Sequence, residues 1–199
     1  MSERVPRKRN ASATKSAILA SAKRAFTAKG FEAAGVREIA ADVGVSVALI
    51  NRYFGSKEGL FIEAVVPEIH FDDLIEGDRS TFGQRAAEYY CNKAHEGLEL
   101  DVTLACLRSI NSPTVTRAID EATEQHVVEK LARWLGGRNA RQRAALIVAH
   151  LIGFDMMKRI NSVSALQAEN AQLAFPYLAA TIQSYVDDDT LAPPLGRPD

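Results

Sequence analysis

The chain has 199 residues, 47% of them hydrophobic, and its formal net charge is −1. This length suits one large domain, or a small domain joined to a larger one, with a sizeable core. Apolar runs stay well short of the roughly 18 to 20 residues that span a bilayer, and the basic N-terminus lacks the apolar stretch of a signal peptide. The two cysteines, Cys91 and Cys106, do not make a disulfide framework. We therefore expect a cytoplasmic protein with no membrane partner.

The charges are distributed unevenly along the chain. Residues 1–60 hold 11 Lys and Arg against 5 Asp and Glu, a balance of +6. Residues 61–199 hold the remaining 13 basic and 20 acidic residues, a balance of −7. A polyanion such as DNA would be attracted to the first part and repelled by the second.

The first 60 residues predict short helices. Residues 1–11 are basic and without apolar periodicity, so they are expected to form a flexible arm that could touch DNA phosphates. Ser12 or Thr14 can cap a first helix, which Gly30 should end. Residues 55–58 are typical of a turn and cap that begin a fourth helix.

Between these helices, the stretch 36–57 has the pattern of a helix-turn-helix. Residues 36–43 place their apolar side chains on one helical face. Gly44 can end that helix with a positive φ, and Ser46 can cap a second helix that begins at Val47. In the second helix Ile50 and Phe54 are four residues apart and should face the core. A short glycine-containing turn between two short helices is the shape of this DNA-binding motif.

The opposite face of the second helix is then expected to be exposed. It has the size and hydrogen-bonding groups that suit the major groove. Small or polar side chains should point outward, and two larger ones should lie along the flank: Val47, Ala48, Asn51 and Arg52 outward, Leu49 and Tyr53 on the flank.

Several spaced elements in residues 14–66 resemble the DNA-binding domain of the tetracycline-repressor-type (TetR) family. They are Gly30-Phe31, Val36-Arg37-Glu38-Ile39-Ala40, Gly44-Val45-Ser46, Tyr53-Phe54 and the run from Ser56 to Phe61. The resemblance implies an all-α chain with a three-helix DNA-binding domain, joined by its fourth helix to a helical domain for ligand binding and dimerisation. It also implies a homodimer that represses by binding a palindromic operator and lets go when a small molecule binds. Transcriptional activation by the same fold remains an alternative.

The chain departs from the family pattern where specificity is decided. The family usually has Thr or Ser before the Val-Arg pair, where this chain has Ala34 and Gly35. A phosphate contact there could come only from backbone amides at the helix start. The recognition helix also lacks the usual glycine and hydroxyl residue after its first position. An operator sequence therefore cannot be carried over from a relative.

Roles follow for the matching positions. Lys57 and the Tyr53 hydroxyl are expected to hold phosphates, and Arg37 a phosphate or a base edge. Asn51 could pair with adenine and Arg52 with guanine, although Arg52 could instead meet a phosphate or a carboxylate. The remaining outward side chains could make only apolar contacts: Val47, Ala48 and Leu49.

The rest of the chain also predicts helices. We expect a DNA-binding domain at 12–56, an effector-binding and dimerisation domain at 57–186, and a disordered tail at 187–199. Pro67 should end or kink the fourth helix, either as a hinge or as a simple boundary, and Pro176 should divide the last helix. The helix from about 140 to 160 is apolar nearly all round over residues 144–160, which suggests that a second subunit covers it. The last two helices would form that homodimer contact.

The effector site is expected among the middle helices of the chain. Its apolar and aromatic side chains favour a hydrophobic or aromatic effector. The candidate lining residues are Tyr89, Tyr90, Arg108, His126, Trp134, Phe154 and Met157. No cofactor is expected. His70, Asp72 and Asp73 resemble a metal cluster only loosely, and a solvated acidic turn is the simpler interpretation.

Two other classes of function compete with this one. An enzyme is disfavoured because no nucleophile, base and orienting group are grouped, and because metalloprotease and phosphate-loop motifs are missing from the sequence. A helical protein that holds a protein partner with its basic arm is the second alternative. Affinity for DNA should fall steeply between about 50 and 200 mM salt, which separates the two.

Overall fold

The computed structural model describes residues 7–92, 100–161 and 163–187, and within these ranges it consists of helices and turns with no strand. The predicted all-α class is confirmed. The described residues pack as two compact units: residues 7–69 with 100–122, and residues 70–92 with 123–161 and 163–187. Residues 1–6 of the predicted arm and residues 188–199 of the predicted tail lie outside the described ranges. The functional division at residues 12–56 and 57–186 remains a prediction.

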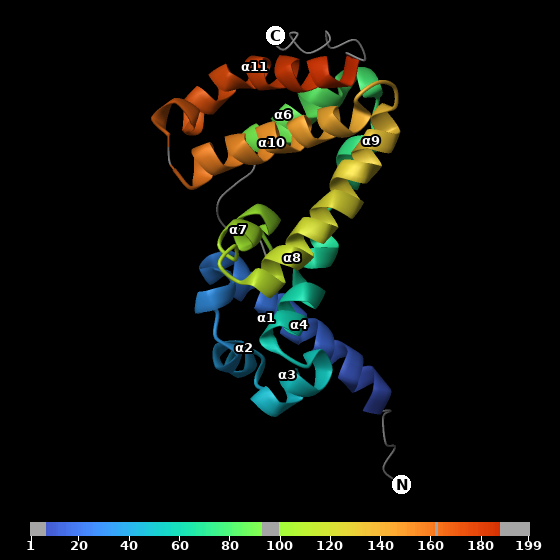
Figure 1. Ribbon diagram of the computed structural model, residues 1–199. Helices are drawn as coiled ribbons and strands as arrows, with labels where there is room; N and C mark the ends of the chain where they lie inside the picture. The colour runs from blue at the N-terminus through green and yellow to red at the C-terminus, as the bar shows by residue number, and fades with distance from the viewer. Residues whose placement is uncertain (1–6, 93–99, 162, 188–199) are drawn as a thin grey trace, which may run out of the picture. The chain divides into compact units, whose positions relative to one another are not determined.

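The first unit contains the segment with the helix-turn-helix pattern (Figure 1). Its helices are α1 (Arg7–Ala33), α2 (Val36–Val43), α3 (Val47–Phe54), α4 (Lys57–Ala64), the 3-10 turn η1 (Val66–Glu68), α7 (Val102–Leu107) and α8 (Pro113–Ala122).

Helix α1 begins earlier than the sequence predicted. It starts at Arg7, inside the expected flexible arm, and not at a cap formed by Ser12 or Thr14. Arginine, lysine and alanine have high helix propensity, which favours an early start of the helix. The predicted end at Gly30 is confirmed, because Gly30 has φ 72° and ψ 179° and interrupts the helical backbone.

Gly30 is required at this position for two reasons. Its positive φ strains any other residue. A Cβ atom there would also lie 2.3 Å from the carbonyl oxygen of Arg108. The close approach lets Arg108 donate to the carbonyls of Thr27 and Ala28, both at 2.7 Å, so that α7 satisfies the free carbonyls at the end of this helical stretch.

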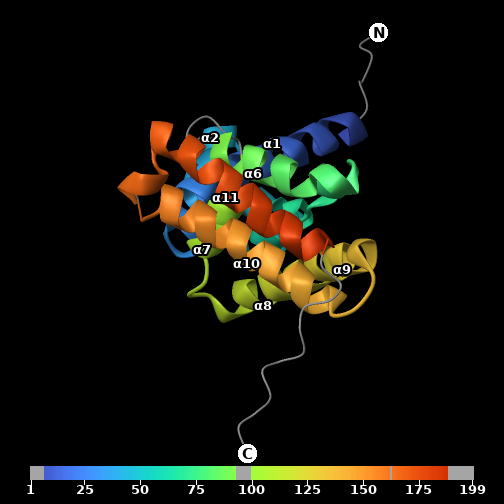
Figure 2. The same cartoon turned by 90° about the horizontal axis from the view of Figure 1, so that it is seen from above.

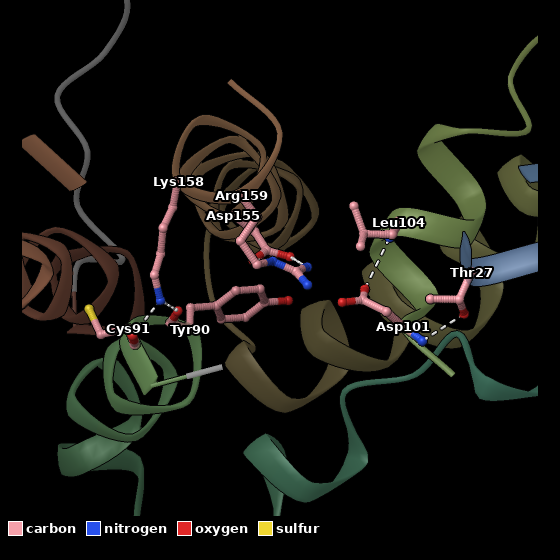
Figure 3. A network of polar contacts seen from close by, with 8 residues as sticks. All are labelled: Thr27, Tyr90, Cys91, Asp101, Leu104, Asp155, Lys158 and Arg159. Carbon is pink, nitrogen blue, oxygen red and sulfur yellow. Dashed lines mark hydrogen bonds and ion pairs between the residues drawn. The ribbon is translucent and has the colours of Figure 1, made fainter. Parts of the chain in front are cut away.

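Two further contacts fix the segment around α7 against α1. The Asp101 amide donates to the Thr27 hydroxyl at 3.0 Å, and the Asp101 carboxylate caps α7 by accepting from the Leu104 amide at 3.0 Å (Figure 3). The Phe31 amide donates to the Ser109 hydroxyl at 3.0 Å. These bonds join residues about 75 positions apart in sequence and explain why α7 packs with α1.

An aromatic cluster forms the centre of this unit. Phe26 and Phe61 lie with their ring centroids 5.0 Å apart, and Phe31 is 5.9 Å from Phe61. Ile18 and Leu60 are fully buried beside them. α1 and α4 therefore enclose a core onto which the shorter helices pack.

Pro67 marks a helix boundary. Helix α4 ends at Ala64, and Pro67 lies in the first turn of η1, where its missing amide costs nothing. The prediction of a boundary is confirmed, whereas a hinge at this position remains a prediction.

The second unit contains the last two helices, α10 and α11, which lie side by side with α6 (Figures 1 and 2). Its elements are α5 (Asp72–Ile75), the 3-10 turn η2 (Arg79–Thr81), α6 (Phe82–Asn92), the π-helical turn η3 (Thr123–Val128), α9 (Glu129–Leu135), α10 (Ala140–Arg159), the 3-10 turn η4 (Ser164–Leu166) and α11 (Ala168–Asp187). Its core is built around Phe82, Leu131, Ile147, Leu151 and Ile182, all fully buried. No described helix is long and apolar enough to cross a membrane.

The prediction that Pro176 divides the last helix is wrong. α11 continues through Pro176 from Ala168 to Asp187. A proline removes the bond to the carbonyl four residues earlier, which here belongs to Gln172. Gln172 and Pro176 are both exposed, so water can satisfy the freed carbonyl and the helix need not break.

A buried arginine holds the ends of α9 and α11 together. Arg143, on α10, is only 1% exposed. Its guanidinium donates to the carbonyls of Gly136, of Arg138 at 3.1 Å, and of Tyr185 and Val186 at 2.9 and 3.5 Å. Because the last carbonyls of a helix have no partner within the helix, this one side chain satisfies groups that would otherwise be buried without a bond.

We predict that Arg143→Met lowers the free energy of unfolding by about 3 kcal/mol, because several buried carbonyls lose their donor at once. The control is Arg141→Met, which removes an exposed ion pair with Glu124 and should cost less than about 1 kcal/mol. Chemical denaturation followed by circular dichroism measures both. Equal losses would show that the carbonyls do not depend on Arg143.

Candidate DNA-binding site

The helix-turn-helix is formed by α2 and α3, as predicted. Gly44 ends α2 with φ 72°, and the amide of Val45 then donates to the Ala40 carbonyl at 2.9 Å. The Ser46 hydroxyl caps α3 by accepting from the Leu49 amide at 3.3 Å. A left-handed residue followed at once by a capping serine produces the tight turn between the two helices.

Two side chains anchor α3. Ile50 is fully buried and Phe54 is 7% exposed, both within the core of the first unit. Ala48, Asn51 and Arg52 on the other face are exposed. Val47, Leu49 and Tyr53 are half-buried along the flanks, which matches the predicted orientation except that Val47 is less exposed than expected. The structure thus brings together on one surface the side chains proposed to meet bases.

Most of the basic side chains that the structure describes in this unit have partners. Four cations on α1 pair with carboxylates on α2, α4 and η1: Lys15 with Glu63, Lys23 with Glu68, Arg24 with Asp42, and Lys29 with Glu38, at 2.6, 2.9, 2.7 and 2.6 Å. Between residues 11 and 57, only Arg37 and Arg52 among the described cations are without a carboxylate or carbonyl partner. Both are exposed, one on α2 and the other on α3.

A small polar network fixes α1 against α2. The Ser21 hydroxyl donates to the Asp42 carboxylate at 2.6 Å, and Arg24 donates to the same oxygen at 2.7 Å. These two hydrogen bonds, that of Ser21 first, hold the pKa of Asp42 below its ordinary value. The orientation of α2 thus depends partly on the ionised form of this carboxyl group.

Lys57 has a partner that the sequence did not indicate. Its ammonium donates to the Glu32 carbonyl at 3.0 Å and lies 4.6 Å from the centre of the Phe31 ring. An ammonium has three N–H donors, so a phosphate contact would use the other two. The sequence pattern gave no signal for this link, because Glu32 and Lys57 are 25 residues apart.

The beginning of α2 lacks a side-chain cap, as expected from Gly35. Gly35 is the N-cap residue, with φ −91° and no side-chain hydrogen bond. The first amides of a helix have no intrahelical partner and attract anions. Any phosphate contact at this end would therefore use the backbone and the neighbouring Arg37.

The structure scatters the candidate effector residues. Tyr90 is buried in the second unit, with the exposed Tyr89 ring 5.1 Å away, and the Trp134 ring lies 5.0 Å from that of Phe82. Phe154 is half-buried in the same unit, whereas His126 and Met157 are exposed. Arg108 lies in the first unit, where it bonds to α1. A common pocket for the seven residues remains a prediction.

Sequence reasoning missed a group of buried charges on α10. Asp155 and Arg159 form an ion pair whose side chains are fully buried, and Lys158 donates to the carbonyls of Tyr90, at 3.1 Å, and of Cys91 (Figure 3). The spacing of four residues between Asp155 and Arg159 was the one available signal. It does not reveal burial, because exposed helix surfaces carry the same spacing.

The fold and this surface define a transcriptional regulator with a helix-turn-helix, a class that binds DNA. Residues 18–64 match the model of the "Bacterial regulatory proteins, tetR family", and residues 80–186 match the "Tetracyclin repressor-like, C-terminal domain". The chain belongs to the TetR family, as its sequence motifs indicated. Members of this family are regulators and are generally not enzymes. A search among curated proteins found no match.

Solved structures of TetR-type regulators share the fold. A regulator from Streptomyces coelicolor is 23% identical, with a TM-score of 0.55 over 94% of this chain and 100% of that one. NalD, a repressor of an efflux pump in Pseudomonas aeruginosa, is 17% identical, with a TM-score of 0.63 over 86% and 95%. A regulator from Saccharomonospora viridis, solved with choline, is 17% identical, with a TM-score of 0.62 over 88% and 96%.

The pKa shift of Asp42 predicts a pH dependence of stability. Because the folded-state pKa lies below the unfolded value, about 3.9, the contribution is fully present above that value and is lost as the pH falls through the folded pKa. Asp42→Asn should therefore lower Tm at pH 7, and its curve should approach that of the wild type near pH 3. Thermal melts between these pH values measure this, with the exposed Asp73→Asn as control. A Tm difference that does not change with pH would contradict it.

Proposed function

We propose that this chain binds a palindromic operator as a homodimer, represses transcription there, and is released by a small effector. The main support for a DNA contact is the exposed face of α3. Asn51 and Arg52 point outward there, while Ile50 and Phe54 are anchored in the core. Arg37 adds an exposed cation at the start of α2. Repressor activity is supported by family membership and by NalD, which is a repressor.

The roles of the individual residues follow from their chemistry. Asn51 offers a bidentate pair to adenine and Arg52 to guanine, each worth about 1–3 kcal/mol of discrimination. The small and apolar side chains beside them, Val47, Ala48 and Leu49, contact thymine methyl groups. Tyr53, Lys57 and Arg37 hold phosphates, which set the register of the helix on the duplex but carry no sequence information.

Dimerisation is supported by apolar side chains on the outer faces of the last two helices. On α10, Leu146, Met156 and Met157 are exposed, as is Ile160 directly after it, and on α11 Leu173 and Tyr177 are 71% and 78% exposed. A hollow of about 500 Å³ lies among Leu173, Tyr177 and the residues near η4. Large exposed apolar side chains on neighbouring helices favour a protein interface. A second copy of the chain, related by a twofold axis, would cover it with the same two helices.

Release by an effector follows from linkage. A ligand shifts the equilibrium only if it binds more tightly to the conformation whose two α3 helices no longer match major grooves about 34–36 Å apart. The aromatic residues of the second unit, including Tyr90 and Trp134, favour a hydrophobic or aromatic effector. The regulator from S. viridis was solved with choline, so small organic molecules reach members of this fold.

Selection of bound sequences from random duplexes tests the DNA contact directly. We expect a palindrome with half-sites about one helical turn apart, and loss of preference for adenine at one position of each half-site in Asn51→Ala. A uniform loss of affinity across operator variants would exclude base recognition by Asn51. Failure to enrich any sequence would contradict operator binding.

The dimer contact has its own test. Tyr177→Glu should place a carboxylate in the apolar face and produce monomers in sedimentation experiments, with at least tenfold weaker operator binding, because one half-site is lost. Ile110→Glu is the control, since Ile110 is 61% exposed in the first unit and lies outside α10 and α11. A Tyr177→Glu protein that remains dimeric would place the interface elsewhere.

A further inference from the structure

The start of α2 carries an ion pair that the proposed DNA contacts do not use. Lys29, near the end of α1, donates to both oxygens of the Glu38 carboxylate at 2.6 and 2.7 Å. Both side chains are about half exposed, so the pair itself adds little to stability. The pair is notable for its position at the start of α2.

Glu38 lies over the beginning of α2. It is in the first turn, and a Cβ atom on the N-cap residue Gly35 would lie 3.8 Å from the Cβ of Glu38 and 4.0 Å from one of its carboxylate oxygens. The Glu38 side chain therefore lies in van der Waals range of the N-cap position, where the family usually has a hydroxyl side chain. The carboxylate belongs to the first turn of the helix whose start is proposed to receive a phosphate.

An uncompensated carboxylate at this place would oppose DNA binding. The helix start attracts a phosphate through its free amides, but a fixed negative charge beside the amides repels the same phosphate. Lys29 supplies the opposite charge on the same two oxygens and restricts where the carboxylate can move. The start of α2, together with the exposed Arg37, then presents a net positive charge to the duplex.

We propose that Lys29 is a positioning residue for operator binding: its ion pair with Glu38 neutralises and holds the carboxylate at the start of α2, so that a DNA phosphate can be accepted there. This role differs from a phosphate contact by Lys29, because the ammonium acts on DNA through Glu38. It rests on the proposed function, in which α2 and α3 face the duplex.

The test uses full-length variants and the operator duplex found by selection, with affinity measured by fluorescence anisotropy between 50 and 200 mM salt. Lys29→Met should weaken binding about three- to tenfold, and Glu38→Gln should strengthen it by a similar factor. The double variant should bind within about twofold of the wild type, with the same salt dependence. Lys29→Arg should keep wild-type affinity, because arginine preserves the ion pair.

Lys23→Met removes the same charge from α1 at its pair with Glu68, on η1, and should change the affinity less than about twofold. If the double variant stays as weak as Lys29→Met, with a salt slope lower by about 1, Lys29 contacts a phosphate itself and the proposal is wrong. An unchanged affinity in Lys29→Met would also overturn it. If the wild type enriches no duplex, the proposed function fails, whatever the variants do.

Discussion

The burial of Ile50 and Phe54 is the constraint on which the DNA-binding surface depends. Helix α3 has 8 residues and would not be stable alone in water. Burying the two side chains contributes roughly 1.5–3 kcal/mol each, and the Ser46 cap about 1 kcal/mol more. Because the helical period is 3.6 residues, fixing Ile50 and Phe54 inward also fixes Ala48, Asn51 and Arg52 outward. The packing that stabilises α3 therefore also holds its recognition face outward.

Fewer cations of the first unit are available to a ligand than its total charge indicates. The sequence balance of +6 over residues 1–60 predicts a broad attraction for DNA. In the folded chain, four cations of α1 are paired with carboxylates and Lys57 with a carbonyl. Between residues 11 and 57, the described cations left for a ligand are Arg37, near the start of α2, and Arg52, in the last turn of α3. Within this stretch the ion pairs therefore leave the unpaired positive charge on the two helices of the motif.

The features that sequence reasoning predicted correctly depend on short-range signals. Gly44, Ser46 and the Ile50–Phe54 spacing each act within one or two helical turns, and the structure shows each in its expected role. The incorrect predictions concern features that depend on contacts or solvent exposure beyond the local sequence. Helix α1 starts earlier than the cap residues indicated, and α11 continues through Pro176 because Pro176 and Gln172 face solvent. The Lys57–Glu32 bond required knowledge of which distant segments meet.

The polarity of helix α10 is reversed at its C-terminal end. In its last turns the charged residues Asp155, Lys158 and Arg159 are buried, whereas Met156, Met157 and Ile160 are exposed. This reverses the usual amphipathic arrangement, and burying charges costs several kcal/mol per ion before pairing offsets it. The cost is compensated on the inside by the Asp155–Arg159 pair and the carbonyls that bind Lys158. On the outside, the apolar surface is compensated if a second subunit covers it, so the reversed polarity of one helix supports the homodimer independently of the family.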